Sequence, residues 1–185
     1  LKVWLVSTLS NNKFYINLKI IELLKSNTDH YYYSEGQGDP IFFLHGFPDC
    51  PENYKDLLSF FASKVYQAIV PYMPGYHPED KDLDTYQSVR IAEEMINFIE
   101  SITDKKILLF GHDWGSSVSY AVAGIRPDLV SKLISVSVPH GLSVGTAFLS
   151  DAEQQRKSWY MFFFQLEVAE IAVSFNDFKF IDRLW

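Results

Sequence analysis

Short apolar runs alternate with longer amphipathic segments from about residue 20 to residue 138. The short runs end at turns rich in Gly, Pro or Asp, which is typical of β-strands. Strands are expected at residues 20–24, 30–33, 41–44, 66–70, 106–110 and 130–138. Strands that alternate with helices predict βαβ units, so we expect an α/β fold with a mostly parallel sheet and helices on both faces.

The segments between these strands carry apolar residues three or four positions apart, as amphipathic helices do. Pro51 begins the first helix, Thr85 caps the second, and the third stops before Arg126-Pro127. The predicted buried faces are Tyr54, Leu58, Phe61 and Val65; Ile91, Met95, Phe98 and Ile102; and Val118, Val122 and Ile125.

The pattern divides the chain into three parts. Residues 1–17 have no clear period and are interpreted as an N-terminal extension, and residues 18–141 as the α/β core. From residue 142 the pattern changes, and nine aromatic residues lie in the range 159–185. Two interpretations stay open for residues 142–185: the start of a helical cap over the sheet, or a further core helix of the main domain.

Composition excludes several classes of protein. Hydrophobic residues make up 48% of the chain and charged residues 21%, which is typical of a globular protein. The net charge of −7, without a basic block, argues against a nucleic-acid partner. A single cysteine, Cys50, excludes an internal disulfide framework and a multi-cysteine zinc site. The sequence has no apolar run of membrane-spanning length and no signal-peptide cleavage pattern, so we expect a cytoplasmic protein that does not contact membranes.

The strongest functional signal is the stretch Leu-Phe-Gly-His-Asp-Trp-Gly-Ser at residues 109–116. A buried strand there turns sharply into a helix, with Gly111 and Gly115 flanking Asp113 and its neighbours. Such a turn strains the backbone of the central residue, and glycines are needed because a flanking Cβ would strike the adjacent strand or helix. The side chain of Asp113 would then project above the strand end, at the amino terminus of the next helix.

A carboxylate at this position selects a reaction class. It is ionised at neutral pH and attacks a carbon electrophile without help from a base, forming an alkyl ester. Attack on an amide would give an anhydride, so amide hydrolysis is disfavoured. The alternative is that Asp113 merely caps the following helix, which is a common role for Asp.

A second motif, Phe-Leu-His-Gly-Phe-Pro-Asp at residues 43–49, follows the third predicted strand. An oxyanion hole needs two converging main-chain N–H groups, and the residue after the nucleophile and the loop after this strand supply them. The predicted donors are therefore Phe47 and Trp114. Gly46 permits the turn, and Pro48 stiffens the loop.

These motifs resemble the α/β-hydrolase superfamily, and within it the soluble epoxide hydrolases and their haloalkane dehalogenase relatives. The resemblance rests on four stretches: His45-Gly46-Phe47-Pro48, Tyr72-Met73-Pro74-Gly75-Tyr76, Gly111-His112-Asp113-Trp114-Gly115, and residues 158–165 (Ser-Trp-Tyr-Met-Phe-Phe-Phe-Gln). It implies an α/β-hydrolase fold with a helical cap after the sixth strand, an Asp nucleophile, a His base with an acidic partner, and two cap tyrosines. It implies no cofactor and no metal.

By this resemblance Asp113 matches the nucleophile, Phe47 and Trp114 the oxyanion-hole donors, and Tyr160 the first cap tyrosine. A phenol such as Tyr160 can hydrogen-bond to the epoxide oxygen and protonate it. No histidine matches the base: His45 belongs to the oxyanion loop and His112 to the turn. The acidic partner and the second tyrosine are also unassigned. We therefore expect the N-terminal part of a longer hydrolase, with the last strands absent, whose sixth strand becomes an apolar sheet edge.

The leading functional hypothesis is hydrolysis of a small, apolar epoxide to a vicinal diol through an ester on Asp113. A dehalogenase is the nearest alternative, although haloalkane-acting relatives commonly have a halide-binding Asn where this chain has Phe47. A non-catalytic protein that binds a small apolar ligand stays open as well. The sequence assigns no oligomeric state.

Overall fold

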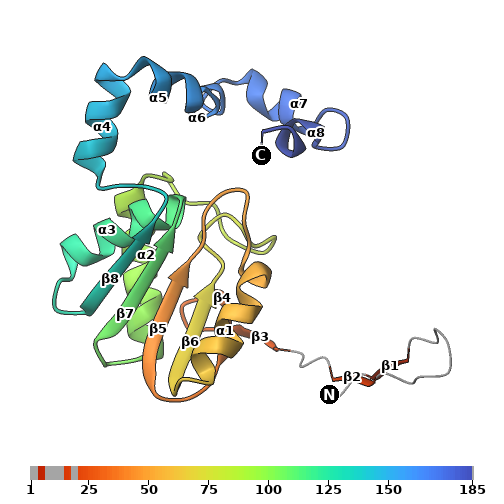
Figure 1. Ribbon diagram of the computed structural model, residues 1–185, viewed down its shortest axis with the longest axis vertical. Helices are drawn as coiled ribbons and strands as arrows, with labels where there is room; N and C mark the ends of the chain where they lie inside the picture. Colours follow the sequence, from red (N-terminus) through yellow and green to blue (C-terminus); the bar gives the residue numbers. More distant parts are fainter. Residues whose placement is uncertain (1–3, 7–14, 18–20, 185) are drawn as a thin grey trace.

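The computed structural model describes residues 4–6, 15–17 and 21–184. Its main feature is a six-stranded sheet with the strand order β3-β4-β6-β5-β7-β8 (Figure 1). The strands are β3 (Leu23–Lys25), β4 (Tyr31–Glu35), β5 (Asp39–Leu44), β6 (Tyr66–Pro71), β7 (Ile107–His112) and β8 (Val130–Val136). The last four in the order run parallel, whereas β4 lies antiparallel to both β3 and β6. The prediction of an α/β fold with a mostly parallel sheet is confirmed.

The predicted N-terminal extension lies largely outside the described residues. Within it, β1 (Trp4–Val6) and β2 (Tyr15–Asn17) pair as an antiparallel ribbon. Residue 20, where the first strand of the sheet was expected to begin, is also outside the described residues, and the described part of that strand starts at Leu23.

Helices cover both faces of the sheet. Short helix η1 (Pro51–Tyr54) leads into α1 (Lys55–Ala62) on one face, and α2 (Ser88–Ile102) and α3 (Trp114–Ile125) lie on the other. Side chains of a strand alternate between faces, and β5 follows this rule. Phe42 and Leu44 join the core beneath α2 and α3, whereas Ile41 and Phe43 join the core beneath α1. These residues are at most 1% exposed, so β5 is buried on both faces and anchors the loop that follows it.

Two details of the predicted helices are wrong. Thr85 does not cap the second helix: α2 begins at Ser88, the extended Gln87 precedes it, and no side chain caps it. Val65 and Ile125 do not face the core, since they are 75% and 44% exposed. Val65 lies beyond the end of α1 at a φ of 67°, where the helical period no longer applies.

A series of short helices, here called the helical segment, follows β8. It comprises α4 (Gly141–Ser150), α5 (Ala152–Lys157), α6 (Trp159–Phe163), α7 (Val168–Ser174) and α8 (Lys179–Asp182). The segment arches above the carboxyl ends of β5, β7 and β8 (Figure 1). The ring of Phe164 in this segment lies 5.5 Å from that of Phe47 in the loop after β5. The segment therefore lies where a cavity above the sheet can form. The domain boundaries at residues 17 and 141 stay predictions.

β8, the last strand in the order, forms an exposed edge of the sheet. Within the described residues β8 pairs with β7 alone, and Ile134 and Val136 on β8 are 47% and 38% exposed. An apolar strand with one unpaired side is a template for pairing with another chain. β8 carries one charged residue, Lys132, and a second charge in place of Ile134 would oppose this pairing further.

We expect this chain to self-associate through β8 at micromolar concentration, and Ile134→Lys to raise the monomer fraction. Sedimentation velocity measures that fraction. Val89→Lys is the control, because Val89 is 56% exposed on α2, away from the edge. A monodisperse parent chain, or equal effects of both substitutions, would contradict the assignment.

A buried histidine fixes the loop after β5. The His45 side chain is fully buried, and its Nε2 accepts a hydrogen bond of 3.1 Å from the N–H of Met73. This bond joins the loop after β5 to the loop after β6. Burial lowers the pKa of His45 from its ordinary 6.5, because protonation would place a charge in the core.

The lowered pKa makes the free energy of unfolding depend on pH, because protonation of His45 is linked to unfolding. The unfolded chain binds a proton at His45 more readily than the folded chain does. The contribution of neutral, buried His45 to the free energy of unfolding is therefore fully present above about pH 6.5. It is lost as the pH falls from there through the lowered pKa.

Urea unfolding at pH 7.5 and 5.5 measures this loss. We expect His45→Gln to make the free energy of unfolding less sensitive to acid than in the parent chain. Burial also lowers the pKa of His30, so part of the acid sensitivity should remain in the His45→Gln variant. Exposed His140 provides the matched control, His140→Gln, which should keep the parental sensitivity. An unchanged sensitivity in His45→Gln would be inconsistent with this role.

Candidate active site

The turn between β7 and α3 holds Asp113 in a strained conformation, with φ of 53° and ψ of −121°. Non-glycine residues rarely adopt a positive φ, and the surroundings must enforce it. Here the turn is closed by the Asp113 N–H, which donates to the carbonyl of Val136 (3.2 Å), and by the Asp113 carbonyl, which accepts from the N–H of Ser116 (2.9 Å).

The crossing of α3 over β5 leaves no room for a side chain at Gly115. A Cβ on Gly115 would lie 2.5 Å from the carbonyl carbon of Leu44. A Cβ on Gly111 would likewise lie 2.5 Å from the carbonyl oxygen of Gly115. Residue 115 must therefore be glycine for the helix to begin this near the sheet, and this close approach keeps the turn sharp.

Ser116 stabilises this turn, although the sequence motif gave it no role. Its side chain is fully buried, and its Oγ lies 2.8 Å from the carbonyls of both Gly111 and Val136. A buried hydroxyl needs such partners. Ser116 thus joins the start of α3 to the ends of β7 and β8. A small polar residue in the first turn of a helix that follows a buried strand is the signal that could have identified it.

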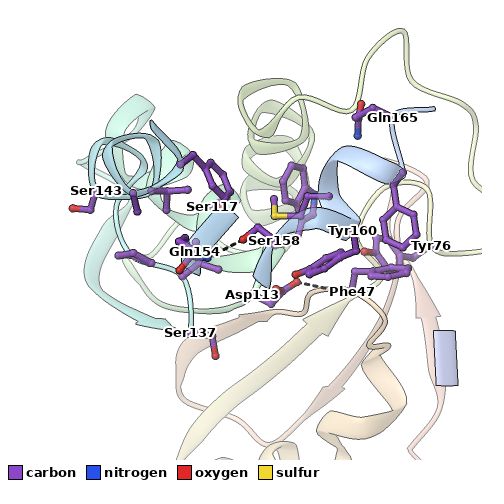
Figure 2. Close-up of a pocket in the computed structure, with 18 residues that line it drawn as sticks. Phe47, Tyr76, Asp113, Ser117, Ser137, Ser143, Gln154, Ser158, Tyr160 and Gln165 are labelled. Atoms are coloured by element: carbon purple, nitrogen blue, oxygen red, sulfur yellow. Dashed lines mark hydrogen bonds between the residues drawn. The ribbon is translucent and has the colours of Figure 1, made fainter. Parts of the chain in front are cut away.

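The Asp113 carboxylate does not cap α3. No hydrogen bond connects its side chain to the helix amides. Instead, Oδ1 accepts a hydrogen bond of 2.9 Å from the N–H of Phe47, across the site (Figure 2). Oδ2 has no hydrogen-bond partner among the described residues. One oxygen is therefore held and the other is available.

The loop after β5 approaches Asp113 closely because residue 46 is glycine. A Cβ on Gly46 would lie 2.5 Å from the Cβ of Asp113. The next peptide, Phe47-Pro48, is cis. The second predicted donor, Trp114, is the first residue of α3 and borders the same cavity. Among the described residues its N–H makes no hydrogen bond to the carboxylate, so of the two predicted donors Phe47 alone donates to the Asp113 side chain.

A cavity of about 590 Å³ lies in front of Asp113, between the strand ends and the helical segment. Its apolar wall consists of Phe47, Trp114, Val138, Pro139, Val144, Ala147, Phe148, Met161 and Phe164. Its polar groups are Tyr76, Asp113, Ser117, Ser137, Ser143, Gln154, Ser158, Tyr160 and Gln165. A mainly apolar cavity with a few polar groups is typical of a small-molecule site.

The polar groups lie on two sides of the carboxylate. Tyr160, Tyr76 and Phe47 lie together on one side of Asp113, whereas Gln154, Ser158 and Ser143 lie on the other (Figure 2). Burial and the negative charge of Asp113 raise the pKa of Tyr160. The Tyr160 phenol is therefore neutral at physiological pH and can donate a hydrogen bond.

Sequence reasoning missed a polar pair in the cavity wall. The amide Nε2 of Gln154 donates a hydrogen bond of 2.8 Å to the hydroxyl of Ser158, which is 5% exposed. Gln154 lies on α5 and Ser158 follows the last residue of that helix, four positions later. No local sequence pattern distinguishes such a pair from a solvent-exposed one.

The remaining predicted residues do not line the cavity: His45, Gly46, Pro48, Gly111, His112 and Gly115. His112 ends β7, and within the described part of the chain no histidine lines the cavity. The described residues contain no group of three His, Cys, Asp or Glu side chains suited to a metal ion. None of their helices has the length and apolarity of a membrane span.

Comparison with known proteins agrees with this architecture. The α/β-hydrolase fold family model matches residues 39–173. Epoxide hydrolase 2 of Caenorhabditis elegans is 30% identical over 174 residues, which are 91% of this chain and 48% of that protein. The AB hydrolase superfamily protein YfhM of Bacillus subtilis is 32% identical over 79% of this chain and 52% of its own length. The chain thus spans about half the length of these curated relatives.

A solved structure resembles the chain in three dimensions. The crystal structure of a Bacillus megaterium epoxide hydrolase in complex with an inhibitor superposes with a TM-score of 0.78 at 25% identity. The match covers 88% of this chain and 58% of that one. On the family match and on the sheet, turn and cavity described above, the chain belongs to the α/β-hydrolase family.

Proposed function

We propose that this chain carries the nucleophile and a proton donor of an epoxide hydrolase. The observation that supports this most strongly is the Asp113 carboxylate, which faces the cavity. One of its oxygens is bound by the Phe47 N–H, and the other has no hydrogen-bond partner in the part of the chain that the structure describes. Several relatives are named epoxide hydrolases, which points to the same chemistry.

In the proposed reaction, Oδ2 of Asp113 forms a bond to one carbon of the epoxide. The bond between that carbon and the ring oxygen breaks, and its electron pair stays on the oxygen. The oxygen takes a proton from a phenol, for which Tyr160 is suited, and the phenolate regains a proton from water. The product is an alkyl ester on Asp113, with its carbonyl oxygen still at the Phe47 N–H.

The second step is attack of water on this ester. The Phe47 N–H would stabilise the negative charge that develops on the carbonyl oxygen. Activation of water needs a base, and no histidine among the described residues lines the cavity. We therefore propose that this chain alone forms the ester and hydrolyses it slowly.

The apolar wall of the cavity favours a small, apolar epoxide as the substrate. An apolar phenyl ring at position 47 and a phenol at position 160 favour an oxygen leaving group over a departing halide. The acidic chain and the apolar cavity favour a small molecule over a nucleic acid as the partner.

Incubation with styrene oxide tests the first step. We expect intact-mass spectrometry to show one adduct of the epoxide, and peptide mapping to place it on Asp113. Asp113→Asn should abolish the adduct, because a neutral amide is a poor nucleophile. Asp104→Asn removes an exposed carboxylate elsewhere and should leave the adduct unchanged.

Ligand-dependent thermal stabilisation without any adduct would favour the non-catalytic alternative. Steady formation of diol over many turnovers would show instead that another group of this chain activates water.

Gly46→Ala tests the geometry of the site. The added methyl would collide with Asp113, so the rate of adduct formation should fall by about a hundredfold, comparable to loss of an oxyanion-hole donor. Gly124→Ala in α3 is the matched control, since nothing lies within 4 Å of its added Cβ. It should keep the parental rate and gain up to about 1 kcal/mol of stability. Parental reactivity in Gly46→Ala would be incompatible with the proposed approach of the loop.

A further inference from the structure

The end of α5 places a polar pair in the cavity wall, on the side of Asp113 opposite Tyr160 (Figure 2). The pair consists of Gln154 and Ser158, whose side chains are joined by a hydrogen bond of 2.8 Å from Nε2 to Oγ. The proposed reaction gives this pair no role. Polar groups in a mainly apolar cavity cost free energy unless they find hydrogen-bond partners, so the pair is suited to a ligand.

The backbone holds both side chains of the pair in position. The carboxylate of Asp151 caps α5 by accepting hydrogen bonds from the N–H groups of Glu153 and Gln154, at 2.9 and 3.2 Å. At the other end of the helix, the Ser158 N–H donates to the carbonyl of Gln154 (2.9 Å), and the Ser158 carbonyl accepts from the N–H of Met161 (3.0 Å). Ser158 thus joins α5 to α6, and the pair is positioned without a ligand.

The hydrogen bond within the pair leaves a donor and an acceptor unused. The hydroxyl hydrogen of Ser158 and the carbonyl oxygen Oε1 of Gln154 have no partner among the described residues. Ser158 is 5% exposed, so a further partner for its hydroxyl must come from the cavity that it lines. With the amide of Gln154 turned over, Ser158 would donate to Oε1, which leaves amide hydrogens and a lone pair of Oγ. Either orientation therefore presents a donor and an acceptor to the cavity.

The charge around the cavity restricts the group that this pair can bind. Within the part of the chain that the structure describes, Asp113 is the one charged side chain that lines the cavity. A carboxylate or phosphate on the substrate would be repelled by Asp113 and would find no cation there. An ammonium group would pair with Asp113 and weaken the nucleophile. A hydroxyl is neutral, both accepts and donates a hydrogen bond, and therefore matches the pair.

We propose that Gln154 and Ser158 bind a hydroxyl of the substrate and thereby select an epoxide with an apolar body and one hydroxyl-bearing arm. This inference rests on the proposed function and narrows its substrate class. The substrate hydroxyl accepts a hydrogen bond from Ser158 and donates one to Gln154. Because the pair and Tyr160 lie on opposite sides of Asp113, the two contacts fix which way round the epoxide lies in the cavity.

Two epoxides that differ by one oxygen atom test the pair. The first, trans-3-phenylglycidol, carries a hydroxymethyl arm where the second, trans-β-methylstyrene oxide, carries a methyl group. Intact-mass spectrometry follows adduct formation on Asp113 at increasing epoxide concentration and yields the half-saturating concentration. For the parent chain we expect this concentration to be about tenfold lower with the hydroxyl-bearing epoxide, because two neutral hydrogen bonds are gained. A second pair of epoxides, with hydroxyethyl and ethyl arms, extends the reach of the hydroxyl by one carbon.

Substitution of the pair should remove this preference. Gln154→Met keeps the length of the side chain without its amide, and Ser158→Ala removes the hydroxyl. Each single variant should lose part of the preference, and the double variant should bring the two half-saturating concentrations within about twofold of each other. The preference is a ratio measured within one variant, so a general loss of reactivity leaves it unchanged.

Gln155→Met is the matched control. Gln155 is the next residue on α5, is exposed and does not line the cavity. Its Nε2 donates to the carbonyl of Phe148 at 2.6 Å, so the substitution removes a hydrogen bond between α5 and α4. This variant should keep the parental preference. Thermal unfolding of each variant verifies that the fold is retained.

The outcomes separate this inference from the proposed function. Adducts on Asp113 without any preference in the parent chain, or a preference that persists in the double variant, would overturn the role of the pair and leave the nucleophile intact. An equal loss of preference in Gln155→Met would assign the effect to looser packing of α5 and would overturn that role as well. Absence of an adduct on Asp113 with all four epoxides would overturn the proposed function itself, and the role of the pair with it.

Discussion

The close approach of three backbone segments governs this structure: the end of β5, the end of β7 and the start of α3. Gly115 allows the helix to begin against the carbonyl of Leu44, and Gly46 allows the neighbouring loop to reach Asp113. Neither position has space for a Cβ. The positive φ of Asp113 is maintained because everything around it is packed and hydrogen-bonded.

The properties of the site follow from this approach. A carboxylate that cannot reach the amides of its own helix meets the N–H of Phe47 instead, and its second oxygen is left facing the cavity. The chain thereby orients a charged group without neutralising it. Buried His45 extends the arrangement, since it couples the loop of Phe47 to the loop of Tyr76. The geometry of the carboxylate and that of the loop carrying Tyr76 therefore depend on a single packed region.

Local chemistry explains which parts could be predicted from the sequence. The apolar runs at 41–44 and 106–110 predict buried strands because burial on both faces requires continuous hydrophobicity. The glycines around Asp113 predict the turn, because a Cβ at their positions would strike the adjacent strand or helix. Thr85 was a wrong cap because helix initiation depends on how the preceding loop leaves β6, which no short motif records.

The parts that escaped prediction depend on long-range contacts. Tyr76 lies far from Asp113 in the sequence, and its position depends on His45, which in turn depends on Met73. The pair formed by Gln154 and Ser158 faces the cavity only because the helical segment arches over the sheet. The antiparallel arrangement of β4 likewise reflects its neighbours in the sheet and not its own residues.

A crystal structure of the chain after reaction with styrene oxide tests the central claim most directly. The account predicts a covalent bond from Oδ2 of Asp113 to a carbon of the former epoxide, with Oδ1 still at the Phe47 N–H. An unmodified carboxylate turned toward the first amides of α3, in the position of a helix cap, would contradict it.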